Sequence, residues 1–120
     1  MPGPMLAVVF GSQAATRVLL FLQNYGQAYA REIARTYEGT SLSQVQKQLA
    51  KFEQGGLLVS RLIGSVRLYE WNPRNPVVPP LRDFLQSGIE LLPPAEIERY
   101  FMQRRRPRRA GKTLAFENDQ

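Results

Sequence analysis

Cysteine and histidine are both absent from the 120-residue chain. Their absence excludes disulfides, thiolate and imidazole metal sites, and catalysis that depends on a Cys or His side chain. No serine therefore has a histidine to act as its base, and the sequence contains no glycine-rich loop that would cradle a phosphate. We therefore expect a protein that is not an enzyme and that uses no metal and no cofactor.

Long apolar runs are also missing. The longest ones, LAVVF and VLLFL, are too short to cross a bilayer. The N-terminal segment MPGPMLAVVFG has no basic residue before its short apolar run, so it does not match a signal peptide. These features predict no membrane partner and, together with the lack of cysteine, a cytoplasmic location.

Acidic residues are scarce only at the C-terminal end of the chain. Residues 1–98 carry nine Lys/Arg and eight Asp/Glu, a net charge of +1, whereas residues 99–120 carry seven and two, a net charge of +5. This imbalance favours a polyanionic partner such as DNA, RNA or an acidic protein surface. A tail that only raises solubility is the alternative. The basic side chains of the tail are Arg104, Arg105, Arg106, Arg108, Arg109 and Lys112.

Helical spacing of apolar residues recurs in the first half of the chain. Ser12 is suited to cap a helix through QAATRVLLFLQN, and AYAREIARTY predicts a second helix, which ends at the glycine turn EGTS. In the following stretch, SLSQVQKQLAKFEQGGLL, Ser41 and Gln44 match the capping box S-x-x-Q. A third helix is therefore predicted over residues 42–54, and Gly55-Gly56 ends it.

The third predicted helix has two distinct faces. Leu42, Val45, Leu49 and Phe52 lie within about 80° of one another on a helical projection, which predicts a buried stripe. The polar side chains that remain can hydrogen-bond to base edges or phosphates, which makes them candidate DNA contacts. A solvated helix surface with no partner is the alternative. The candidates are Ser43, Gln44, Gln46, Lys47 and Lys51.

A hairpin and further helices follow. LLVSRLI and VRLYEWN flank Gly64-Ser65, a pair typical of two-residue hairpin turns, and Arg61 and Arg67 beside this turn are candidate phosphate contacts. PPLRDFLQSGIELL and AEIERYFMQ predict two C-terminal helices. Because three helices and a hairpin already enclose a core, the apolar stripe of the first C-terminal helix predicts a dimer interface, with packing inside the chain as the alternative. This stripe contains Leu81, Phe84, Leu85, Ile89 and Leu92.

Several of these motifs together resemble a known family. YAREIAR, then GTSLSQVQKQLAKFEQGGLL, then RLYEWNP is similar to the winged helix-turn-helix of ArsR/MarR-type bacterial and archaeal regulators, over roughly residues 10–75. The resemblance implies binding of double-stranded DNA as a homodimer, with helix 42–54 in the major groove and the hairpin along the backbone. Metal-sensing members use Cys and His ligands, so that activity is excluded here.

The predicted fold class is α+β, mostly helical: a winged helix with a three-helix core plus a β-hairpin wing in residues 1–75. Residues 76–103 are predicted to form C-terminal helices for dimerisation, and residues 104–120 a basic tail. The predicted function is a sequence-specific double-stranded DNA-binding transcriptional regulator, a homodimeric repressor. The alternative is a protein-interaction module or antitoxin on the same scaffold, which partners an enzyme such as a nucleotidyltransferase-like toxin.

Overall fold

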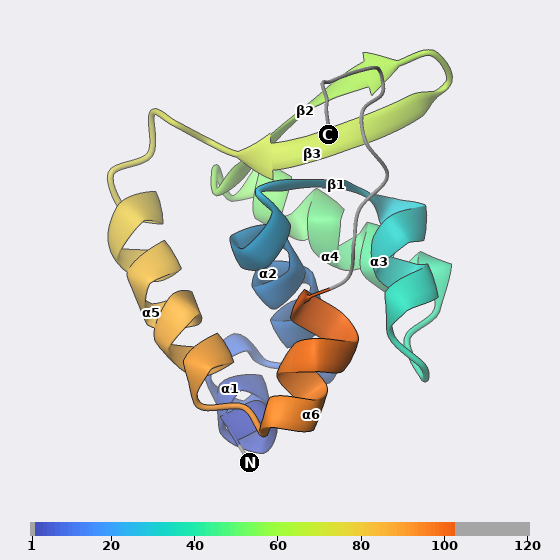
Figure 1. Ribbon diagram of the computed structural model, residues 1–120. Coiled ribbons are helices and arrows are strands. Elements are labelled where there is room, and N and C mark those ends of the chain that lie inside the picture. The colour runs from blue at the N-terminus through green and yellow to red at the C-terminus, as the bar shows by residue number, and fades with distance from the viewer. Residues whose placement is uncertain (1, 103–120) are drawn as a thin grey trace, which may run out of the picture.

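The computed structural model describes residues 2–102, with side chains from Leu6 onward. It has an α+β fold, mostly helical, in which the helices pack beneath a small antiparallel sheet (Figure 1). The elements in chain order are α1 (Pro2–Phe10), α2 (Gln13–Tyr25), β1 (Gln27–Tyr29), α3 (Ala30–Thr36), α4 (Leu42–Gln54), β2 (Leu58–Ile63), β3 (Val66–Trp71), α5 (Val78–Glu90), α6 (Pro94–Glu96) and the π-helical turn η1 (Ile97–Phe101).

The sheet has three strands in the order β1-β3-β2. The predicted hairpin of β2 and β3 is confirmed, and Gly64 takes a φ of +64° in its turn, a conformation that favours glycine. The short strand β1 pairs with the other edge of β3, with Ala28 opposite Tyr69. The prediction that Ala28 and Tyr29 belong to the second helix is wrong, because they form part of β1 and the helix begins at Ala30.

Helix α2 is the centre of the core and is surrounded by the other helices (Figure 1). Its predicted cap is confirmed, because the Ser12 hydroxyl accepts a hydrogen bond from the backbone N–H of Ala15 at 3.0 Å. At the other end of α2, the Trp71 indole N–H donates to the Leu22 carbonyl at 3.1 Å. This bond attaches the end of β3 to the central helix.

Helix α1 was not predicted, because its segment was considered only as a targeting signal. Its Leu6 side chain is fully buried and lies against Gly88 of α5. The ring of Phe10, at the end of α1, packs edge-on against Phe84 at a centroid distance of 6.1 Å. The N-terminal segment therefore forms a helix because α2 and α5 together offer it an apolar surface.

Helix α5 packs along α2 inside the same chain (Figure 1). Of the five residues predicted to form a dimer interface, Leu85, Ile89 and Leu92 are buried in the core and Leu81 is half-buried. Only Phe84 is exposed, with 43% of its surface accessible. Most of the stripe is therefore buried by packing inside the chain, which was the alternative prediction. Dimerisation itself stays a prediction.

One hydrophobic core includes residues of the predicted N-terminal domain and of the C-terminal helices alike. The Arg82 guanidinium Nε strengthens this junction by donating to the Gln23 side chain of α2 at 2.8 Å. None of the helices within residues 2–102 has both the length and the apolar character needed to cross a membrane.

Candidate nucleic-acid interface

The third predicted helix is observed as α4, with the start that its capping residues predicted. The Ser41 hydroxyl accepts from the Gln44 backbone N–H at 3.2 Å, and the Gln44 side-chain oxygen accepts from the Ser41 N–H at 2.9 Å. At the other end, Gly56 has a φ of +86°, and the Leu57 N–H donates to the Phe52 carbonyl at 2.9 Å. Both ends of α4 are therefore fixed by local hydrogen bonds.

The two faces of α4 are separated as predicted. Val45, Leu49 and Phe52 are buried, and Leu42 is half-buried. We call the opposite side the outer face of α4. Its residues are all exposed: Ser43, Gln46, Lys47, Ala50, Lys51 and Gln54.

The two candidate glutamines of α4 have different surroundings. Gln44 is exposed, but its side-chain oxygen is occupied by the N-terminal cap of the helix. A paired contact with adenine needs both the oxygen and the NH2 group of a glutamine. Gln46 makes no side-chain hydrogen bond within the described residues, so it can supply both groups at once.

The hairpin is oriented against α4 by a short polar chain. Arg67 donates to the Ser60 hydroxyl at 3.0 Å, and Ser60 donates to the Glu53 carboxylate at 2.6 Å. Burial and then the nearby Glu53 carboxylate raise the pKa of Tyr69 on β3, so this phenol remains a neutral donor. Both predicted arginines of the hairpin, Arg61 and Arg67, are exposed, and Arg67 has a structural contact in addition to its predicted role.

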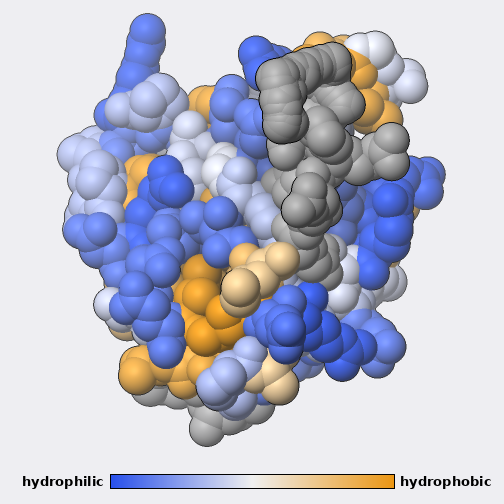
Figure 2. Space-filling view, in the orientation of Figure 1, coloured by the Kyte–Doolittle hydropathy of each residue, from blue (hydrophilic) through white to orange (hydrophobic). Residues whose placement is uncertain are grey.

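The tip of the hairpin is apolar. Leu62, Ile63 and Val66 are exposed by 61%, 43% and 46% respectively. Figure 2 shows this apolar tip at the upper right of the molecule. An apolar surface of this kind is suited to contact with another apolar surface, and it offers no charge or hydrogen-bond donor to a nucleic-acid backbone.

A groove of about 400 Å³ separates the first turn of α4 from the hairpin. Gln46 and Arg67 both line it, so two predicted contacts from distant parts of the sequence lie in one site. Arg31 of α3 also lines the groove and is exposed, although it was not among the predicted contacts. The sequence could have indicated this arginine. Arg31 precedes the apolar Ile33 by two positions, so the two side chains lie on opposite sides of α3.

The remaining candidates are distributed over two regions. Ser43, Lys47 and Lys51 project from the outer face of α4, outside the groove. The basic residues of the tail, from Arg104 to Arg109 and Lys112, lie outside the described residues. Their role as a DNA-binding arm is therefore unchanged as a prediction.

No family model, curated protein or solved structure matches the chain. Within residues 2–102, no group of three or more acidic side chains is placed to hold a metal ion. The candidate site consists of the outer face of α4 and the groove beside it.

Proposed function

We propose that the protein is a winged helix-turn-helix regulator that binds double-stranded DNA in a sequence-specific manner. The observation that carries the proposal is the outer face of α4, a polar surface on a helix whose other face is anchored in the core. Helices α2, α3 and α4 followed by a hairpin, with β1 completing a small sheet, are compatible with the winged-helix fold. In this reading α4 enters the major groove.

The dimensions and chemistry of α4 support this docking. An α-helix with its side chains is about 10–12 Å in diameter, and the major groove of B-DNA is about 12 Å wide. Ser43 and Ala50 are short and allow a close approach of the helix to the bases. Gln46 can form paired hydrogen bonds with adenine, and Lys47 can donate to guanine or to a phosphate.

We expect basic side chains beside α4 to contact the phosphates. Arg31 and Arg67 line the groove between α4 and the hairpin, and Arg61 is exposed on β2. Such contacts fix the register of a protein on the duplex without reading its sequence. Arg31 therefore adds α3 to the predicted contact surface.

The regulator is proposed to act as a homodimeric repressor. A second copy would present a second α4 to a half-site about one DNA turn away. Exposed apolar residues on α1, on α5 and directly after α5 offer the surface for that second copy, and they include Val8, Val9, Phe84 and Leu91. Measuring the solution mass of the purified protein tests this part of the proposal.

Selection of bound sequences from a random DNA pool tests the DNA-binding proposal directly. We expect enrichment of one motif, and Lys47→Ala should lower affinity by about 1–3 kcal/mol and change the preferred base at one position. Arg31→Ala should weaken binding to all sequences alike, because it contacts phosphate. Arg74→Ala removes an exposed arginine that does not line the groove and is the matched control. A pool that shows no enrichment at low salt would overturn the proposal.

The exposed apolar tip of the hairpin favours a second candidate function. Leu62, Ile63 and Val66 suit a contact with another protein, such as the enzyme half of a toxin–antitoxin pair. In that case Leu62→Asp should abolish capture of a stoichiometric protein partner and leave the fold intact, since this side chain is exposed. The outer face of α4 and the hairpin tip share no residue, but Leu62 and Val66 also line the groove beside α4. Ile63 does not line it, so Ile63→Asp separates the two functions: it should abolish partner capture and leave DNA binding unchanged.

A further inference from the structure

The groove between α4 and the hairpin combines exposed apolar side chains with exposed positive charge. Leu62 and Val66 form its apolar wall and are 61% and 46% exposed. Arg31 and Arg67 supply its charge, and both are exposed. No aspartate or glutamate is among the described residues that line it. An apolar segment that carries negative charge would therefore complement this groove.

The two arginines of the groove keep hydrogen-bond donors for a partner. Arg31 makes no hydrogen bond or ion pair with any residue in the part of the chain that the structure describes. Arg67 donates from its Nη1 to the Ser60 hydroxyl at 3.0 Å. Since a guanidinium has several N–H donors, each side chain can still donate to a carboxylate, and such charge-assisted hydrogen bonds are among the stronger ones.

A segment with the complementary chemistry follows the basic residues of the tail. Residues 114–120 read LAFENDQ and lie outside the described residues. Leu114 and Phe116 are apolar, Glu117 and Asp119 are acidic, and the segment contains no basic residue, so its net charge is −2. Side chains two positions apart lie on the same side of an extended chain. The two apolar side chains can therefore enter one groove together.

We propose that residues 114–120 dock in this groove of the same molecule. Leu114 and Phe116 lie against the apolar wall of the groove. The carboxylates of Glu117 and Asp119 accept hydrogen bonds from its two arginines. The docked segment then covers part of the surface that the DNA-binding proposal assigns to the phosphates.

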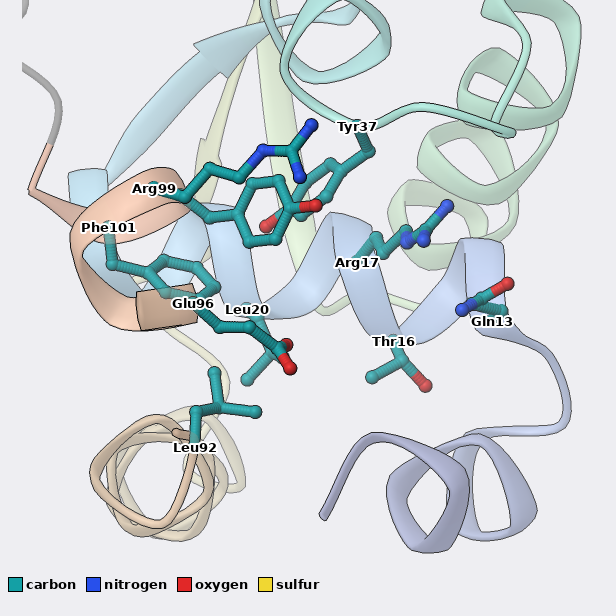
Figure 3. A pocket seen from close by; sticks show the side chains of 10 residues that line it. Gln13, Thr16, Arg17, Leu20, Tyr37, Leu92, Glu96, Arg99 and Phe101 are labelled. Carbon is teal, nitrogen blue, oxygen red and sulfur yellow. The ribbon is translucent and has the colours of Figure 1, made fainter. Parts of the chain in front are cut away.

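The last described turn of the chain, η1, lies one helix length from the groove. The rings of Tyr37 and Tyr100 pack at a centroid distance of 4.9 Å, which places η1 beside the end of α3 (Figure 3). Arg99 of η1 also pairs with Glu38, directly after α3, at 3.2 Å. The other end of α3 carries Arg31 and lines the groove. A helix of this length measures only about 10 Å.

The connection between η1 and the docking segment is long enough to cover this distance. Residues 103–113 join Met102 to Leu114. A flexible connection of this length spans about 20 Å on average and about 40 Å when fully extended. Short flexible connections give effective concentrations of about 1 mM, so a segment with a Kd of about 1 mM as a separate peptide is docked in about half of the molecules.

Charge favours the groove over the exposed apolar surface on the other side of the molecule. Phe84 and Leu91 are exposed on α5 and directly after it. Residues 72–98, which include them, carry two basic and four acidic residues, a net charge of −2. Residues 30–71, which line the groove, carry six basic and four acidic residues, a net charge of +2. An acidic segment is therefore repelled from α5 and attracted to the groove.

Docking has a consequence for DNA binding that rests on the proposed function. A segment that occupies the groove in about half of the molecules lowers DNA affinity about twofold. Phe116→Ala weakens the docking and keeps every charge of the chain, so it should raise DNA affinity by about this factor. The basic and the acidic parts of the tail therefore act on DNA binding in opposite directions.

Paramagnetic NMR on the full chain tests the docking without DNA. The chain has no cysteine, so Gln120→Cys carries a nitroxide spin label at a single position, and the reduced label gives the reference intensities. The backbone amide signals of Leu62 and Arg67 in the groove should be broadened by the label. The signal of Glu90 should not be, because the end of α5 lies away from the hairpin tip (Figure 1).

Two variants of the labelled chain separate the apolar contribution from the charged one. Phe116→Ala should lower the docking equilibrium constant about 10-fold, because it removes most of an apolar side chain from the groove. Arg31→Gln should lower it about 2- to 5-fold by removing one exposed ion pair. Arg74→Gln makes the same change at an exposed arginine that does not line the groove, and it should leave the broadening unchanged.

A mixture of the labelled chain with an isotope-enriched chain that has no label shows whether docking occurs within one molecule. We expect no broadening of the groove signals in this mixture. Three results would overturn the inference: no more broadening in the groove than at Glu90, unchanged broadening in Phe116→Ala, or groove broadening in the mixture. Because none of these measurements uses DNA, their outcomes are separate from a failure of the DNA-binding proposal.

Discussion

Gly88 in α5 offers a sharp test of how the N-terminal helix is held. Glycine inside a helix is less favourable than alanine by about 1 kcal/mol, so helix propensity alone predicts that Gly88→Ala stabilises the protein. The packing opposes this gain. A Cβ atom at position 88 would lie 3.1 Å from Leu6 Cδ1 and 3.8 Å from Leu6 Cδ2.

The two effects can be weighed against each other. Leu6 is fully buried, so its side chain cannot move into solvent, and overpacking of this kind costs about 1–3 kcal/mol. Gly88→Ala should therefore change the free energy of unfolding by between zero and a loss of about 2 kcal/mol. In a Leu6→Ala background the collision is absent, and the same change should stabilise the protein by about 1 kcal/mol.

Urea denaturation measures the coupling between these two sites. The four proteins to compare are the wild type, both single variants and the double variant. The expected coupling is about 1–3 kcal/mol. Ser87→Ala, an exposed neighbour on α5, is the control, and its effect should be the same in both Leu6 backgrounds. If Gly88→Ala has an equal effect in both backgrounds, then α1 does not pack against α5 through this pair.

Three further predictions concern α4, Tyr37 and the tail. Gln44→Ala should lower the free energy of unfolding by about 1 kcal/mol through loss of the cap, whereas Gln46→Ala should leave thermal stability unchanged and relax base preference at one position. Since burial raises the pKa of Tyr37, the folded state keeps a proton that the unfolded state loses above about pH 10. Stability should therefore fall above that pH, by up to about 1.4 kcal/mol per pH unit more in the wild type than in Tyr37→Phe, and parallel curves would contradict this. Deleting residues 104–120 should reduce the salt dependence of DNA binding, measured as the slope of log affinity against log salt, by about 0.9 per lost phosphate contact, and an unchanged slope would remove the tail from the interface.

Features set by nearby residues could be predicted from the sequence. The caps at Ser12 and Ser41, the buried stripe of α4 and the turn at Gly64 each depend on residues within a few positions of one another. Hydrogen bonds and apolar spacing at this range leave a clear pattern in a single sequence.

Features that depend on distant contacts could not be predicted in the same way. Strand β1 has only three residues and exists because β3 offers a free edge about 40 positions later in the chain. The helix α1 depends on a surface formed with α5, and the ring contact between Tyr37 and Tyr100 joins the end of α3 to the C-terminal segment. No local spacing connects these segments.

The distribution of charge favours one orientation of the protein toward a polyanion. Residues 30–71, from α3 to the end of β3, carry six basic and four acidic residues, a net charge of +2, whereas residues 72–98 carry two and four, a net charge of −2. Within the positive segment, Glu32 accepts the Tyr29 N–H at 2.9 Å, and Glu53 accepts the Ser60 hydroxyl. These two carboxylates are held in the fold, while Arg31, Lys47 and Lys51 are exposed. We therefore expect α3 and α4 to face the phosphates and α5 to face away from them, which is the orientation that the proposed major-groove binding by α4 requires.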